Sequence, residues 1–203
     1  MRKLTIATAL LFALAATAQA QKPSASAGPA DAQADQQQLI DEFQALDHFG
    51  NRKITMFSTM YGVDGPFVGD ANPIRDVIGD ELPWTIDGFV IGDLDTRGHL
   101  RILVHGLVFA DDPSVPPELV GTNDEPFFRG LVSCLTETAD DTVETQNVIT
   151  DGYPATVQGD SFIHATVELP NPCVAPIVMI LAGSEDKWFA VSGFESEDEG
   201  ATH

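Results

Sequence analysis

Two cysteines offer the clearest pairwise chemistry in the sequence. Cys134 lies in a run rich in β-branched and aromatic residues, and Cys173 lies just before another such run. An even number of cysteines in an exported protein is typical of disulfides, and two cysteines allow a single pairing. We therefore predict a disulfide between Cys134 and Cys173. A redox or nucleophilic thiol is the less favoured alternative, because the chain has no Cys-x-x-Cys motif.

Several acidic residues have the type and spacing of calcium ligands, which are carboxylate and carbonyl oxygens. Asp93, Asp95 and Gly98 imitate positions 1, 3 and 6 of an EF-hand loop. However, Arg97 and Val104 occupy positions 5 and 12, where that loop needs oxygen ligands. We interpret 95–98 as a hairpin turn. Two other oxygen-rich stretches could hold calcium or simply be solvated: 123–125 and 140–141.

The sequence lacks the common catalytic motifs, among them Gly-x-Ser-x-Gly, His-Glu-x-x-His and the phosphate-binding loop. His99 and His105 would share one face of a strand but lie about 20 Å apart, too far to bind one metal ion. We therefore predict no catalytic, cofactor-binding or metal-binding residue. A hydrolase whose paired carboxylates meet only in the folded chain remains an alternative.

Strands are the elements that must position these residues. Runs rich in β-branched and aromatic residues recur between glycine and proline turns, which is typical of a sandwich or barrel. The runs are 54–61, 84–94, 99–109, 127–135, 142–150, 162–169, 177–181 and 187–194. We predict an all-β domain over 54–195, an immunoglobulin-like or jelly-roll sandwich of about eight strands. The glycine- and aromatic-rich stretch 60–67 is either a binding loop or a turn that covers one end of the sandwich.

The N-terminus has the pattern of a secretory signal peptide. Arg2 and Lys3 precede the apolar stretch 4–16, and a small-x-small cleavage site ends at Ala20, so we expect the mature chain to start at Gln21. The expected destination is the periplasm or the medium, reached by the general secretory route.

The remaining segments flank the predicted sandwich. Residues 21–35 contain no large apolar side chain and are predicted to be a disordered leader. Apolar residues spaced by three and four predict a short helix at 36–49, followed by a lead-in to residue 53. The acidic residues 196–203 are predicted to be a disordered tail.

The net charge of −21 limits the classes of partner. Binding to nucleic acid needs clustered lysine and arginine, so we do not expect it. An acidic surface attracts cations or basic proteins instead. The longest apolar run after the signal peptide, 177–182, is too short to cross a bilayer, so we expect a soluble protein that does not insert into a membrane.

Five blocks of the sequence together resemble a group of exported bacterial proteins. They are MYGVDGPFVG (60–69), ELPWTI (81–86), NDEPFFRGLVSCLT (123–136), LPNPCVAPIVMI (169–180) and KWFAVSGFE (187–195). The resemblance implies export and a compact β domain with two cysteines. It implies no reaction, ligand or functional residue.

These observations favour an exported protein without catalytic activity, either a binding module or a structural component of the cell envelope. The hydrolase described above and a calcium-stabilised adhesion module are the two alternatives. Calcium is the one cofactor that the composition admits, through the oxygen-rich stretches.

Overall fold

The computed structural model describes residues 37–38, 40–41 and 52–194. The described residues of the predicted helix are helical, and the side-chain amide of Gln37 donates to the carboxylate of Asp41 at 2.9 Å. The other residues of that helix lie outside the described residues. So do the predicted signal peptide, its cleavage site at Ala20 and Gln21, the leader and the acidic tail.

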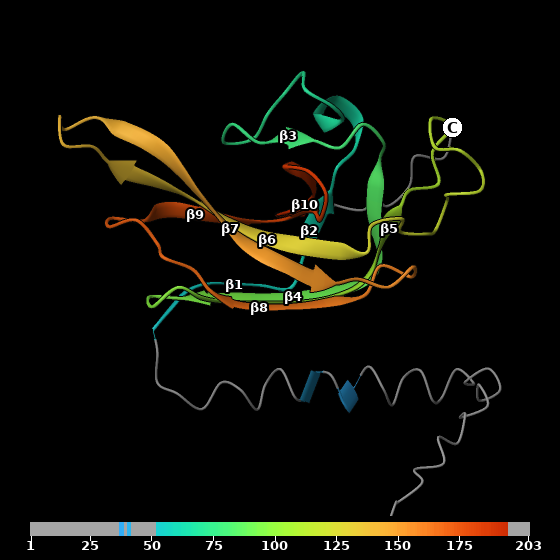
Figure 1. Cartoon of the computed structure of the whole chain (residues 1–203), viewed down its shortest axis with the longest axis horizontal. Coiled ribbons are helices and arrows are strands. Elements are labelled where there is room, and N and C mark those ends of the chain that lie inside the picture. Colours follow the sequence, from blue (N-terminus) through green and yellow to red (C-terminus); the bar gives the residue numbers. More distant parts are fainter. Residues whose placement is uncertain (1–36, 39, 42–51, 195–203) are drawn as a thin grey trace, which may run out of the picture. The chain divides into compact units, whose positions relative to one another are not determined.

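In the described residues, ten strands form two sheets. The sheets pack face to face (Figure 1). The four-stranded sheet has the order β1 (Lys53–Phe57), β4 (Trp84–Asp95), β5 (His99–Phe109), β8 (Ser161–Thr166). The six-stranded sheet has the order β2 (Met60–Gly62), β10 (Lys187–Ser192), β9 (Val174–Ala182), β6 (Phe127–Glu137), β7 (Val143–Pro154), and β3 (Ile78–Gly79) pairs with β10. All pairings are antiparallel except that of β3 with β10. The prediction of an all-β sandwich is confirmed.

The predicted hairpin turn joins β4 to β5. The carboxylate of Asp95 accepts hydrogen bonds from the backbone N–H groups of Arg97 (2.8 Å) and His99 (3.1 Å). Gly98 has φ of 80°, and a Cβ atom there would lie 1.9 Å from the carbonyl oxygen of Val167. The turn needs glycine for both reasons, because other residues rarely adopt positive φ.

Large apolar side chains from both sheets fill the space between them. Phe128 and Phe189 of the six-stranded sheet lie with their rings 5.8 Å apart in an edge-to-face arrangement. Gly130 of β6 faces Leu100 and Ile163 of the other sheet, since a Cβ atom there would lie 2.8 and 3.3 Å from those side chains. Glycine at this position lets the two sheets approach closely.

Residues 63–83, which we call the cover segment, lie over the outer face of the six-stranded sheet. Gly130 faces the other sheet, so the next residue, Leu131, and its cross-strand partner Met179 point to the outer face. Both side chains are fully buried there. The ring of Phe67, in a short 3-10 helix (Gly65–Phe67), lies 6.2 Å from that of Trp188. The stretch 60–67 therefore contributes β2 and then covers a sheet face, rather than one end of the sandwich.

The disulfide between Cys134 and Cys173 is present, as predicted. It joins residues 39 positions apart and connects β6 to the segment that leads into β9. Cys134 is fully buried. The bond therefore ties the central strands of the six-stranded sheet to the loop that follows β8.

Candidate functional site

A groove lies between β7 and β8, the last strands of the two sheets. Its volume is about 390 Å³. The lining side chains come from Val148, Ile149, Thr150, Asp151, Tyr153, His164, Ala165, Thr166, Val167 and Glu168. The lining thus contains two carboxylates and one imidazole but no lysine or arginine. This volume falls within the range of ligand-binding pockets.

Backbone hydrogen bonding determines the shape of the groove. At one end, Ala155 and Ser161 form an isolated bridge, and the hydroxyl of Ser161 donates to the carbonyl of Pro154 at 2.9 Å. Beyond that end the two strands belong to different sheets, β7 pairing with β6 and β8 with β5. Among the described strands, none pairs with the outer edge of β7. An extended chain in the groove could use the backbone groups of that edge.

Tyr153 and His164 line the groove and contact each other across it. The phenol of Tyr153 donates to the backbone carbonyl of His164 at 2.5 Å, and the two rings lie 5.2 Å apart. Burial and the nearby carboxylate of Asp151 raise the pKa of Tyr153. The phenol therefore remains protonated at neutral pH and holds the two strands at a fixed separation.

The fold uses Asp93 and Asp95 for structure. Asp93 is buried and paired with Lys53 at 2.8 Å and with Arg101 at 2.5 Å. Asp95 caps the hairpin turn and also contacts the ring of His99 at 2.8 Å. Basic groups thus occupy both carboxylates, in agreement with the interpretation of 95–98 as a turn.

The oxygen-rich stretches also have structural partners. The side-chain amide of Asn123 donates to the carbonyls of Glu125 (2.7 Å) and Thr156 (2.8 Å), which joins two loops. Residues 140–141 form the turn between β6 and β7, and the backbone N–H of Asp141 donates to the carbonyl of Thr138 at 3.1 Å. Neither stretch gathers three acidic side chains around a point.

One acidic group in the described part of the chain could hold a metal ion, and the sequence did not predict it. Asp80, Glu81 and Glu185 place carboxylate oxygens within 4.8 Å of one another. The ammonium of Lys187 already contacts Glu81 and lies 2.7 Å from Glu185, and these hydrogen bonds, led by that to Glu185, raise its pKa to about 12. A lysine thus supplies the positive charge that a cation would bring.

Asp80 is the buried member of this group and supports the core. Its carboxylate accepts hydrogen bonds from the indole N–H of Trp84 at 2.9 Å and from the backbone N–H of Leu82 at 3.2 Å. Burial raises the pKa of Asp80 above the ordinary 3.8. The carboxylate lies outside the groove between β7 and β8, so it does not contribute an acid to that site.

Asp80→Asn is expected to change how stability depends on pH. Because the folded chain binds this proton more tightly than the unfolded chain, the free energy of unfolding of the wild type falls as pH rises from 3.8 through the raised pKa. Asparagine cannot ionise, so the variant does not lose this stability. The melting temperature of the variant minus that of the wild type should therefore increase as pH rises over this interval. Thermal melts from pH 3 to pH 8 test this, and a difference that is constant with pH would contradict it.

Comparison with known proteins adds no relative from which a function could be transferred: no family model, curated protein or solved structure matches the chain.

Proposed function

We propose that the protein is an exported binding module without catalytic activity, and that its ligand is an extended, basic polypeptide segment. The observation that carries the proposal is the groove between β7 and β8, which combines acidic side chains with an unused sheet edge. Extended peptides often bind by adding a strand to such an edge, where backbone hydrogen bonds give affinity and side-chain contacts give specificity.

Export is supported by the predicted signal peptide and by the disulfide, because disulfides persist in oxidising compartments. In the described part of the chain, no helix is long and apolar enough to cross a membrane. A destination in the periplasm or the medium fits these features.

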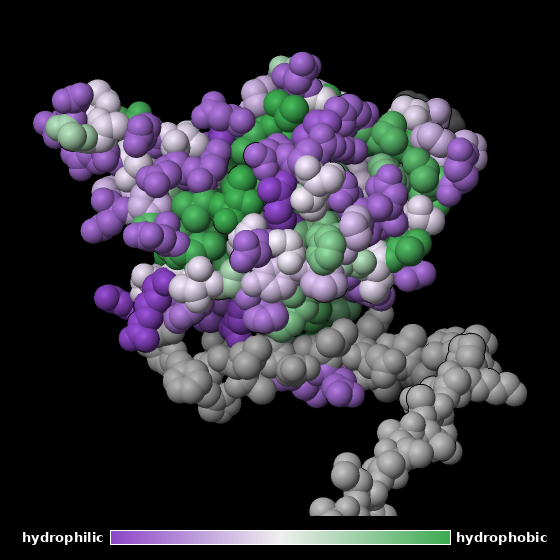
Figure 2. All heavy atoms as spheres, viewed as in Figure 1, coloured by the Kyte–Doolittle hydropathy of each residue, from purple (hydrophilic) through white to green (hydrophobic). Residues whose placement is uncertain are grey.

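The basic character of the ligand follows from charge. Asp151 and Glu168 are the charged residues of the lining apart from His164, and the chain as a whole carries a net charge of −21. Complementary charge speeds association and disfavours partners of the same sign. On the face shown in Figure 2, hydrophilic side chains dominate, and hydrophobic ones gather near β9 and beside β3. Within the groove, Asp151, Glu168 and His164 offer electrostatic contacts, and the apolar residues of the lining offer packing.

The proposal is tested with a ten-residue peptide that alternates lysine and valine, titrated calorimetrically into the oxidised protein. We expect binding that weakens as salt rises. The double substitution Asp151→Asn and Glu168→Gln should weaken it about threefold to tenfold, as expected for the loss of two partly exposed charge pairs. A peptide that alternates glutamate and valine should not bind.

Asp124→Asn with Glu118→Gln is the matched control, because both residues are exposed and lie outside the groove. The control removes the same charge and should change the affinity less than twofold. If both double variants weaken binding equally, the attraction comes from the overall charge and the groove is not the site. Absence of binding by the basic peptide would also refute the proposal.

A further inference from the structure

The cover segment has an unusual tip. Residues 73–76 form its far end, and Arg75 and Asp76 have φ of 52° and 67°. Residues other than glycine rarely adopt this left-handed conformation, and they keep it where surrounding contacts impose it. Two hydrogen bonds connect the tip to the sheet: Asn147 donates to the carbonyl of Arg75 at 2.8 Å, and Arg75 donates to the carbonyl of Ala175 at 3.1 Å.

Three polar atoms beneath this tip are buried and have no hydrogen-bond partner: Nη1 of Arg75, Oγ of Ser133 and Oδ1 of Asn147. Ser133 is 0% exposed. Native proteins satisfy nearly all buried polar groups, so a group of three calls for a physical explanation. A missing ligand is one such explanation.

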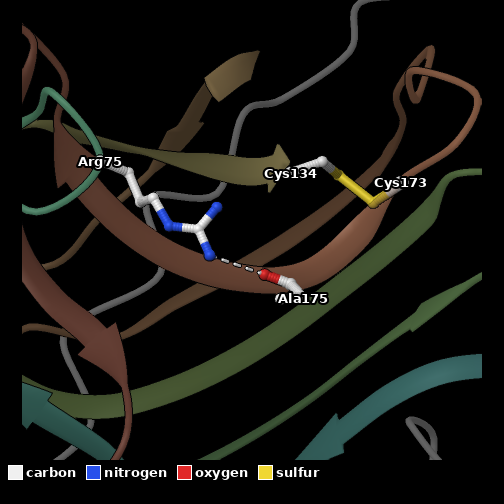
Figure 3. The surroundings of a disulfide bond; sticks show 4 residues. All are labelled: Arg75, Cys134, Cys173 and Ala175. Carbon is white, nitrogen blue, oxygen red and sulfur yellow. Dashed lines mark hydrogen bonds between the residues drawn. A yellow bond between two sulfur atoms is a disulfide. The ribbon is translucent and has the colours of Figure 1, made fainter. Parts of the chain in front are cut away.

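Strand register places the three atoms together. Ser133 of β6 is the direct partner of Asn147 on β7, so their side chains project from the same face. Arg75 contacts Asn147 through its backbone and reaches Ala175 of β9 with its guanidinium, and β9 lies on the other side of β6. The side chain therefore crosses β6 near Ser133. Figure 3 shows the guanidinium pointing toward the carbonyl of Ala175, near the disulfide.

Arg75 also has no counter-charge. Among the described residues no carboxylate forms an ion pair with it, whereas Arg101 pairs with Asp93 and Arg129 with Asp186. The guanidinium is half-buried, and its Nη2 donates to the neutral carbonyl of Ala175, so no acidic side chain among the described residues neutralises its charge.

We propose that Arg75, Ser133 and Asn147 form a second binding site, for an oxyanion that keeps a proton at neutral pH, namely inorganic phosphate. The guanidinium and the hydroxyl donate to the oxygens of the anion. The carbonyl oxygen of Asn147 can only accept, so it selects a ligand that carries an O–H group. Sulfate has no proton at neutral pH and would leave this acceptor unsatisfied.

Entry of the anion requires the tip to move, because all three atoms are buried. The two hydrogen bonds of the tip to the sheet must break for this movement, and the left-handed residues Arg75 and Asp76 can then relax. At 0.15 M salt, charges farther away than about 8 Å are largely screened, so acidic residues elsewhere on the surface repel the anion only weakly.

Thermal melts of the oxidised full chain test the site at pH 7 and constant ionic strength. Inorganic phosphate at ten times its dissociation constant should raise the melting temperature by about 3 °C or more, and sodium chloride and sulfate should not. Glycerol 3-phosphate is a separate arm. A phosphate monoester loses its second proton near pH 6, so most of it carries no O–H on phosphorus at pH 7, and its shift should be smaller than that of inorganic phosphate.

Arg75→Gln should abolish the phosphate-dependent shift, and Arg75→Lys, which keeps the charge but loses the forked donors, should reduce it. Arg97→Gln is the matched control, since Arg97 is an exposed arginine in the β4–β5 turn, and it should leave the shift unchanged. No shift with inorganic phosphate, an equal shift with sulfate or with glycerol 3-phosphate, or an unchanged shift in Arg75→Gln would overturn the proposal.

Discussion

Trp84→Ala is expected to lower the free energy of unfolding by about 4 kcal/mol, near the upper range for single core substitutions. Trp84 is 2% exposed and stacks on Phe189 with ring centres 3.8 Å apart, and Phe109 lies 4.2 Å away on ring centres. The substitution removes these contacts and leaves a cavity. It also leaves the buried carboxylate of Asp80 without its indole donor.

Chemical denaturation monitored by circular dichroism measures this loss, and the midpoint should fall without a change in slope. Trp84→Phe should lose less, because it keeps an aromatic ring while removing the donor. Met56→Ala is the control for a large-to-small change at an exposed position, since Met56 is 68% exposed, and it should alter stability by less than about 0.5 kcal/mol. A comparable loss in Met56→Ala would contradict the assignment of Trp84 to the core.

Removing the disulfide by Cys134→Ala with Cys173→Ala should lower the free energy of unfolding by about 4 kcal/mol. The bond closes a loop of 39 positions, and the chain-entropy relation gives this magnitude for that length. The estimate counts the freedom that the unfolded chain regains. Denaturant titrations of the oxidised wild type and of the double variant measure the difference.

A reducing agent supplies the control for this prediction. It should lower the midpoint of the wild type to near that of the double variant, and it should leave the double variant unchanged because that chain has no other cysteine. Equal midpoints for the reduced and oxidised wild type would show that the bond does not contribute to stability.

Local sequence patterns predicted the fold class and the longest elements. The β4–β5 hairpin lies where the β-rich runs and the turn at 95–98 placed it, because strand and turn preferences agree there. The disulfide was also predictable, since two cysteines allow one pairing. These features depend on neighbours in sequence or on simple counting.

Features that depend on tertiary contacts were not predictable. The run 54–61 was predicted as one strand, but it divides into β1 and β2, which belong to different sheets, and the chain crosses between them at residues 58–59. The proline-rich stretch that follows lies outside the predicted strand runs, yet it contains β3 and covers a sheet face. Burial against Trp188, more than 100 positions away, determines this structure.

The candidate site depends on strand order, which the sequence left open. Tyr153 and His164 face the same groove because β7 and β8 end their respective sheets, and no motif marks either residue. The carboxylates that the sequence did single out, Asp93 and Asp95, are paired with basic groups elsewhere. Spacing along the chain identified the turn, whereas the groove arises from pairing between distant strands.

The position of β10 has a consequence for the order of folding. This strand is the last of the described elements, yet it lies between β2 and β9 and supplies Phe189 to the core. During synthesis, β2 and the cover segment therefore cannot pair with β10 until the other described strands have been made. The six-stranded sheet can therefore be completed only through a contact between strands far apart in sequence, which is the kind of contact that forms slowly.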